Sequence, residues 1–264
     1  MIATTITHKK IVQKYYSGRA SEYDGQKART WKSEAGFECK VLEAIIKAVH
    51  EAGAGFGLDA GVGSGRVFAH LVKRMGLSAI GVDLSREMLK LARKKMDSVA
   101  RTSHLLLGDI EFLPFRRGSV SLLLCISTLH YFPSSHVALM EFSRVLKKSG
   151  IFIYGDVTMH EMDTRGFMNE LEKSISPAHG GYHRPSEVRS LMESHGIRVT
   201  KTKTIPYRKS FKSLNEDKTR YFNIDSQSLR KFLKGATGKE RILYEIREDE
   251  MTLFYTVISG VRKE

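Results

Sequence analysis

The chain has 264 residues, of which 41% are hydrophobic and 27% charged, so it can bury a sizeable core and is not expected to be disordered. Its two cysteines, Cys39 and Cys125, exclude a disulfide framework. No apolar run approaches the roughly 20 residues of a membrane span, and the first residues lack the apolar segment of a secretory signal. We therefore expect a reduced, cytoplasmic protein without a transmembrane segment.

The net charge of +14 is concentrated in two segments. Residues 198–241 contain 13 Lys and Arg against four acids, and residues 1–33 contain seven against two. Segregated positive charge favours an anionic partner, such as RNA, an acidic lipid or a phosphorylated metabolite. A basic surface that is merely solvated is the alternative.

Between residues 37 and 157, amphipathic helical patterns alternate with short apolar runs. The expected helices are 37–52, 66–75, 86–99 and 137–146, the last closed by the basic residues and glycine of 147–150. The expected strands are 56–60, 79–84, 104–110, 120–127 and 151–157. This alternation predicts an α/β fold with a doubly wound, mostly parallel sheet whose ligands bind at one edge.

The last third of the chain predicts a helix over 185–195 and two long strands, 198–207 and 251–262. Two other segments, 159–183 and 208–247, are expected to be insertions that cap the active-site edge. We expect residues 1–264 to form a single domain with these additions.

A glycine-rich loop joins the first expected strand to the next helix. Gly61, Gly63 and Gly65 lie between Ala60 and Arg66, and glycine there lets the backbone turn sharply and approach a ligand. A dinucleotide fold has G-x-G-x-x-G/A, and its third small residue would fall on Arg66. The loop instead fits the pattern D-x-G-x-G-x-G.

This loop resembles the first motif of the class I S-adenosylmethionine-dependent methyltransferases. Four further motifs follow in order and resemble those of the small-molecule and quinone methyltransferase branch: residues 81–89, 107–115, 129–131 and 141–147. The resemblance covers residues 40–196. It implies a seven-stranded Rossmann-like sheet, S-adenosylmethionine as cofactor and S-adenosylhomocysteine as product.

The resemblance also assigns cofactor-binding roles. Asp59 and the loop residues Ala60, Gly61, Gly63 and Gly65 would hold the methionine part. Asp83 would accept hydrogen bonds from both ribose hydroxyls. The other implied contacts are with the adenine, for Leu84, Met88, Asp109 and Ile110, and beside the transferred methyl, for Ser127. Helix caps are the alternative for Asp83 and Asp109, and core packing for Met88.

The first 36 residues resemble the aromatic lead-in segment of quinone and metabolite methyltransferases, which folds over the cofactor as a lid. Tyr15 and Arg19 would then close on the methionine carboxylate. The alternative is a surface helix with ordinary packing tyrosines.

His130 and Tyr131 are the candidate catalytic residues, because they follow the fourth strand at the ligand edge. His130 could instead be a structural hydrogen-bonding residue. His179 and His183 could suggest a metal, but no third ligand is apparent, so we expect none.

Three functions remain open. The first is in-line methyl transfer to a small-molecule acceptor, which the basic segments allow to be anionic. The second is methylation of tRNA or rRNA, with 198–241 as the binding region. The third is a non-catalytic protein that binds S-adenosylmethionine or NAD. The stretch Ser127–His130 lacks the prolines of base-amino methyltransferases, and Cys125 lies within a strand, which disfavours a cytosine-C5 mechanism.

Overall fold

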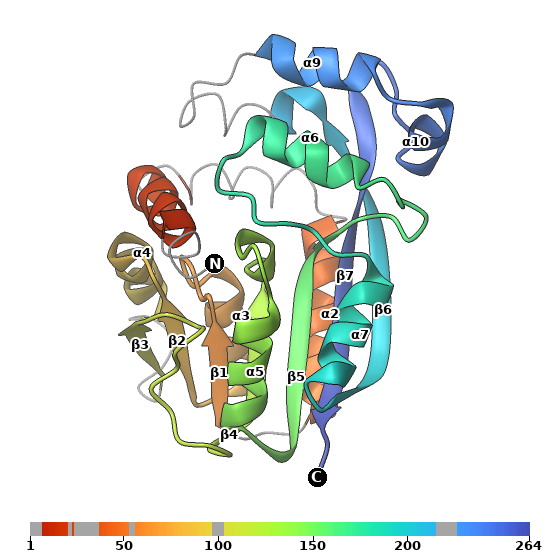
Figure 1. The fold of residues 1–264 in the computed structure, drawn as a ribbon. Coiled ribbons are helices and arrows are strands. Elements are labelled where there is room, and N and C mark those ends of the chain that lie inside the picture. Colours follow the sequence, from red (N-terminus) through yellow and green to blue (C-terminus); the bar gives the residue numbers. More distant parts are fainter. Residues whose placement is uncertain (1–6, 21–22, 24–36, 53–55, 97–102, 215–225) are drawn as a thin grey trace.

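The computed structural model describes residues 7–20, 23, 37–52, 56–96, 103–214 and 226–264. Seven strands form one sheet in the order β3-β2-β1-β4-β5-β7-β6 (Figure 1). β7 runs antiparallel to its neighbours, and the other pairs are parallel. The predicted doubly wound, mostly parallel sheet is therefore confirmed. The strands are β1 (Gly57–Ala60), β2 (Ala79–Asp83), β3 (His104–Leu107), β4 (Val120–Ile126), β5 (Leu146–Thr158), β6 (Ile197–Ser210) and β7 (Glu250–Arg262).

Helices cover both faces of this sheet. One face packs against α2 (Phe37–Ala52) and α3 (Arg66–Met75), and the other against α5 (His136–Val145) and α7 (Pro185–Ser194). The central strand β4 shows why both faces need cover. Its alternate residues Leu122 and Leu124 enter the first core, whereas Leu123 enters the second. A further helix, α4 (Arg86–Met96), links β2 to β3.

The segment between α5 and β5 differs from the prediction. The helix ends at Val145, and residues 147–150 belong to β5 instead of closing the helix. Leu146 pairs with Val120, but Ile151 pairs with Leu122, so the four residues between them bulge out of the ladder. A Cβ on Gly150 would lie 2.7 Å from the carbonyl oxygen of Lys147. The glycine that resembled a helix cap is therefore required by a β-bulge.

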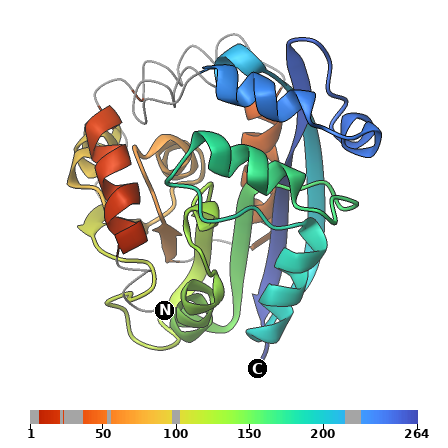
Figure 2. The ribbon, with the colours of Figure 1, turned by 45° about the horizontal axis from the view of Figure 1, so that its top comes forward.

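Above the carboxyl ends of the strands lies a group of helices that we call the cap. It comprises α6 (Phe167–Ile175), α9 (Ser226–Lys234) and α10 (Gly238–Leu243), and Figures 1 and 2 show it over β5, β6 and β7. The two segments that supply it are distant in sequence but share a hydrophobic core. That core includes Phe167, Leu171, Leu229, Leu233 and Tyr244.

A helix formed by residues 7–20 lies beside the same end of the sheet, against the start of α4 (Figure 2). The side chain of Gln13 donates to the carbonyl of Leu84 at 2.9 Å, and Ser17 donates to Glu87 at 2.8 Å. These contacts fix the helix over the carboxyl end of β2.

Candidate functional site

The glycine loop after β1 is held by backbone bonds and by close packing. The amides of Gly61 and Val62 both donate to the carbonyl of Val82, at 2.8 and 3.0 Å. Gly61 has a φ of 92°, and a Cβ there would lie 2.3 Å from the Thr128 hydroxyl oxygen. Gly65 has a φ of 74°, and its Cβ would lie 2.9 Å from that of Ala92 on α4. Only glycine satisfies both the backbone conformation and these approaches.

Gly63 differs from its neighbours because no atom lies within 4 Å of where its Cβ would stand, although its φ is also positive. Its amide donates to Asp83 Oδ2 at 2.8 Å, and Asp83 Oδ1 accepts from the amide of Ser85 at 2.8 Å. The carboxylate is thus fixed at the end of β2 beside open space. Burial raises its pKa, and these backbone hydrogen bonds oppose the shift.

Asp59 of β1 supplies a second carboxylate near the glycine loop, and its side chain is almost fully buried. Its Oδ1 has no hydrogen-bond partner within the part of the chain that the structure describes. Burial, and secondly the proximity of Asp83, raises the pKa of Asp59 to about 7. A buried carboxylate oxygen without a partner is costly, so this site fits a ligand that brings a positive donor.

The loop and both carboxylates line a cavity of about 240 Å³. The predicted site residues that line it are Asp59, Gly61, Gly63, Asp83, Leu84, Met88, Ile110, Ser127 and Tyr131. The others, which do not line it, are Ala60, Gly65, Asp109, Tyr15, Arg19 and His130. We call the part around Asp59 and Asp83 the carboxylate end.

Asp109 has a partner that the sequence did not suggest. Lys9, from the 7–20 helix, lies 2.5 Å from Asp109 Oδ2 and also pairs with Glu111. Lys9 itself lines the cavity. Its ammonium lies 5.3 Å from the centre of the Phe112 ring. The carboxylate expected to face an adenine amine is thus engaged by a lysine that the sequence analysis missed.

The N-terminal helix contributes different residues from those expected. Tyr15 and Arg19 are buried against each other: the Arg19 guanidinium donates to the Tyr15 hydroxyl and lies 4.9 Å from the centre of its ring. The neighbouring Tyr16 lines the cavity instead, and its hydroxyl is hydrogen-bonded to that of Tyr131. A one-residue step along a helix turns a side chain by about 100°, which a motif match does not resolve.

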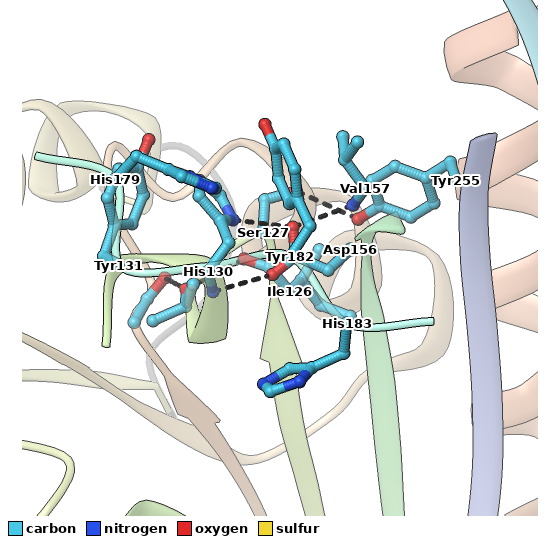
Figure 3. A network of polar contacts seen from close by, with 12 residues as sticks. Ile126, Ser127, His130, Tyr131, Asp156, Val157, His179, Tyr182, His183 and Tyr255 are labelled. Atoms are coloured by element: carbon cyan, nitrogen blue, oxygen red, sulfur yellow. Dashed lines mark hydrogen bonds and ion pairs between the residues drawn. The ribbon is translucent and has the colours of Figure 1, made fainter. Parts of the chain in front are cut away.

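Ser127 and Tyr255 form a second hydroxyl pair, shown in Figure 3 at the carboxyl end of β4. Their oxygens are 2.9 Å apart, and both residues line the cavity. Ser127 has a φ of 52°, an unfavourable backbone conformation for a residue with a Cβ, and its amide donates to the carbonyl of Gly155. Together with Tyr16 and Tyr131, these two residues form what we call the phenol end of the cavity.

His130 does not line this cavity, and its side chain is bonded to Asp156 of β5 (Figure 3). Its Nδ1 lies 2.7 Å from Asp156 Oδ1, and its backbone amide donates to Oδ2 at 3.3 Å. Asp156 is fully buried and was not anticipated from the sequence. The geometry favours the structural alternative for His130, because the pair fixes the turn that carries Tyr131.

The two histidines considered as metal ligands have other partners. His179 Nε2 lies 2.9 Å from the Asn169 side-chain oxygen, and His183 Nε2 lies 3.1 Å from Ser135. Among the described residues, no group of three or more His, Cys, Asp or Glu side chains is arranged to hold a metal ion. Nor does any helix of the described ranges have the length and apolar character needed to cross a membrane.

The sequence is also similar to those of known methyltransferases. A family model described as a methyltransferase domain matches residues 58–154. A malonyl-[acyl-carrier protein] O-methyltransferase of Hamiltonella defensa is 30% identical over 152 residues, which cover 58% of this chain and 54% of the relative. An arginine hydroxylase of Danio rerio, NDUFAF5, is 28% identical over 147 residues, or 54% and 44% of the two chains. This chain therefore spans about half the length of these curated relatives.

Among solved structures, the YcgJ protein of Bacillus subtilis superposes with a TM-score of 0.71 at 22% identity, covering 85% of this chain and 99% of that one. This likeness concerns the fold. The five ordered motifs, the strand order and the matching family model lead to one conclusion. Residues 58–154 match a methyltransferase domain, on a sheet and with motifs that resemble those of the class I S-adenosylmethionine-dependent methyltransferases.

Proposed function

We propose that this chain transfers the methyl group of S-adenosylmethionine to a small-molecule acceptor bound in the cavity at the carboxyl end of the sheet. One observation carries the proposal: one cavity joins the buried carboxylate of Asp59 and the half-buried carboxylate of Asp83 to a group of hydroxyls. The cofactor, when bound, supplies a methyl group on a positively charged sulfur, already activated for in-line displacement.

The carboxylate end suits the polar parts of that cofactor. In the proposed arrangement, the unpartnered oxygen of Asp59 accepts from the methionine ammonium, and Asp83 accepts from the ribose hydroxyls. Gly61 and Gly63 leave room for the backbone to approach the ligand. The adenine would lie among three apolar side chains that line the cavity: Leu84, Met88 and Ile110.

The 7–20 helix would act as a lid. Lys9, Val12 and Tyr16 line the cavity from this helix, and we expect it to move when a ligand enters or leaves. An adenine amine and Lys9 would compete for, or share, the carboxylate of Asp109. By excluding water, the closed helix would strengthen the electrostatic contacts within the site.

The basic segment 198–241 does not require an RNA acceptor. β6 is the edge strand of the sheet, and exposed lysines on an edge discourage pairing with other chains. Two of these cations also have acidic partners: Lys201 pairs with Glu51, and Arg208 with Glu245 and Glu250. RNA methylation therefore remains an outcome of the test. The cytoplasmic location expected from the sequence also stays a prediction.

Calorimetric titration with S-adenosylmethionine, followed by transfer of its radiolabelled methyl group, tests the proposal. We expect saturable binding and label in a small organic product. Binding without any transfer would contradict methyl transfer and favour a binding protein or other chemistry, such as the hydroxylation in the name of one relative. Label in RNA that declines steeply with salt would favour the RNA alternative.

A further inference from the structure

The hydroxyl groups at the phenol end form two pairs, and among the described residues each pair leaves one O–H hydrogen without an acceptor. Tyr16 bonds Tyr131, and Ser127 bonds Tyr255. A hydroxyl has one hydrogen to donate, so within each pair one O–H is used on the partner and the other remains available. All four residues line the cavity. The phenol end therefore offers two O–H donors.

These tyrosines are held in the protonated form. Burial raises the pKa of the hydroxyls of Tyr16, Tyr131 and Tyr255 well above their usual range. At neutral pH they donate hydrogen bonds and do not accept protons from an acceptor. The hydroxyl of Thr128, which follows Ser127, donates to backbone carbonyls, at 3.0 Å in the case of Ile126.

The titratable side chains near these O–H donors limit which kind of methyl acceptor the site can use. Asp59 and Asp83 belong to the carboxylate end, and the imidazole of His130 is bonded to Asp156. A third carboxylate that lines the cavity, Glu38, pairs with Arg66 at 3.4 Å. An alcohol or an ammonium group must lose a proton during methyl transfer, whereas an ionised carboxylate need not. An oxygen anion is also the partner that two O–H donors bind best, because charge-assisted hydrogen bonds are the strongest.

Building on the proposed function, we infer that the methyl acceptor is a carboxylic acid, bound as its carboxylate by one O–H from each hydroxyl pair, and that the product is a methyl ester. A carboxylate oxygen attacks the methyl carbon, and a C–O bond forms as the C–S bond breaks. The electron pair of the C–S bond passes to sulfur, giving S-adenosylhomocysteine, and no proton is transferred.

Matched acceptors test the nucleophile directly. Octanoate, octanol and octylamine share one carbon chain, and benzoate, benzyl alcohol and benzylamine share one ring. Each is incubated with the full chain and S-adenosylmethionine that carries a tritiated methyl group. We expect label only with the carboxylates, as an ester that releases volatile methanol in alkali. Label on an alcohol or amine, or no label on any acceptor while calorimetry shows the cofactor bound, overturns the inference. Absence of cofactor binding would instead reject the proposed function.

Two variants test the hydroxyl pairs. Tyr131→Phe and Tyr255→Phe each remove one hydroxyl, and we expect kcat/KM for the carboxylate to fall roughly tenfold to a hundredfold, as for loss of a hydrogen bond to a charged group. Their Kd for S-adenosylmethionine should stay within about twofold. Tyr244→Phe is the matched control, because that buried hydroxyl donates to Asp163, which precedes α6, and Tyr244 does not line the cavity. Unchanged carboxylate kinetics in both variants would also overturn the inference.

Discussion

The two ends of the cavity are built in different ways. The carboxylate end comes from two adjacent strands and the loops that follow them, within residues 57–88. The phenol end combines Tyr16 of the N-terminal helix, Ser127 and Tyr131 after β4, and Tyr255 of β7. The first end offers negative charge and the second offers hydrogen-bond donors. Under the proposed function, the first end would recognise the positive groups of the cofactor, and the second would be free to vary with the acceptor.

The largest effect is expected where the two ends of the cavity meet, at the close contact between Gly61 and the Thr128 side chain. In Gly61→Ala a methyl group would overlap the Thr128 side chain at a positive φ, and we expect about 3 kcal/mol of lost stability. Thermal unfolding measures this loss. Gly118→Ala is the control, since its φ of 63° is similar but the nearest atom lies 3.9 Å away. Equal losses in both variants would show that the contact is unimportant.

The next effect concerns Asp83. Asp83→Asn keeps an acceptor oxygen for only one of the two amides, of Gly63 and Ser85, that donate to the carboxylate, and it removes the charge that we expect the ribose hydroxyls to meet. The Kd for S-adenosylmethionine should rise roughly a hundredfold, since two charge-assisted hydrogen bonds are weakened. Calorimetry measures it, with the exposed Glu248→Ala as control. A Kd that stays the same would remove Asp83 from the cofactor site.

A smaller effect is expected from pH at Asp59. In the ligand-free protein its pKa is about 7, and an ammonium beside it would favour the ionised form, so cofactor binding releases a proton. Affinity should then fall by up to about tenfold for each pH unit below 7, and Asp59→Asn should lose this dependence. Tyr131→Phe should retain it, because Tyr131 belongs to the phenol end. A flat profile in the unaltered protein would contradict the assignment.

The same residue affects stability in the opposite sense. Its folded pKa of about 7 exceeds the ordinary value of 3.8, so the folded protein binds more protons than the unfolded chain between these pH values. The free energy of unfolding of the ligand-free protein should therefore decrease as the pH rises from about 4 to about 7. Above pH 7 the protein should keep the whole of this destabilisation. Asp59→Asn should accordingly raise the Tm at pH 8, and a lower Tm there would count against this explanation.

The smallest effect is expected far from both ends, on the exposed basic residues of α9. Replacing Arg230, Lys231 and Lys234 by alanine should change kcat/KM for a small acceptor by less than about twofold, because exposed charges act weakly at a distance. Activity measured over a range of salt concentrations provides the check. A large loss, or steep salt dependence that the triple variant abolishes, would point to a polyanionic acceptor bound on the cap.

The sequence predicted the carboxylate end well because its residues follow one another along the chain. Asp59, Gly63 and Asp83 stand where strands and turns end, and local patterning locates such ends. Lys9, Tyr255 and Asp156 were not anticipated, because each acquires its role from a partner far away in sequence. Asp156 and His130 are 26 residues apart, and Tyr255 and Ser127 are 128 apart. No period or spacing within either segment encodes those contacts.

The short bulge after α5 was misassigned for a related reason. A run of basic residues followed by glycine is typical of a helix end, and the sequence signal alone does not distinguish it from a bulge. The pairing of Leu146 with Val120 decides the matter, and that pairing exists only once β4 and β5 lie side by side. Tertiary contacts thus override local preference at this position.

The position of Lys9 bears on how quickly a used cofactor could be exchanged. Its ammonium joins the 7–20 helix to Asp109 and Glu111, and Tyr16 of the same helix bonds Tyr131. All of these contacts must break each time the helix opens, whatever the speed of the chemical step. The residence time of the product S-adenosylhomocysteine, and hence the turnover rate, would then depend on the ion pairs of Lys9 with Asp109 and Glu111. Lys9→Met would shorten that dwell time while leaving the reacting atoms as they are.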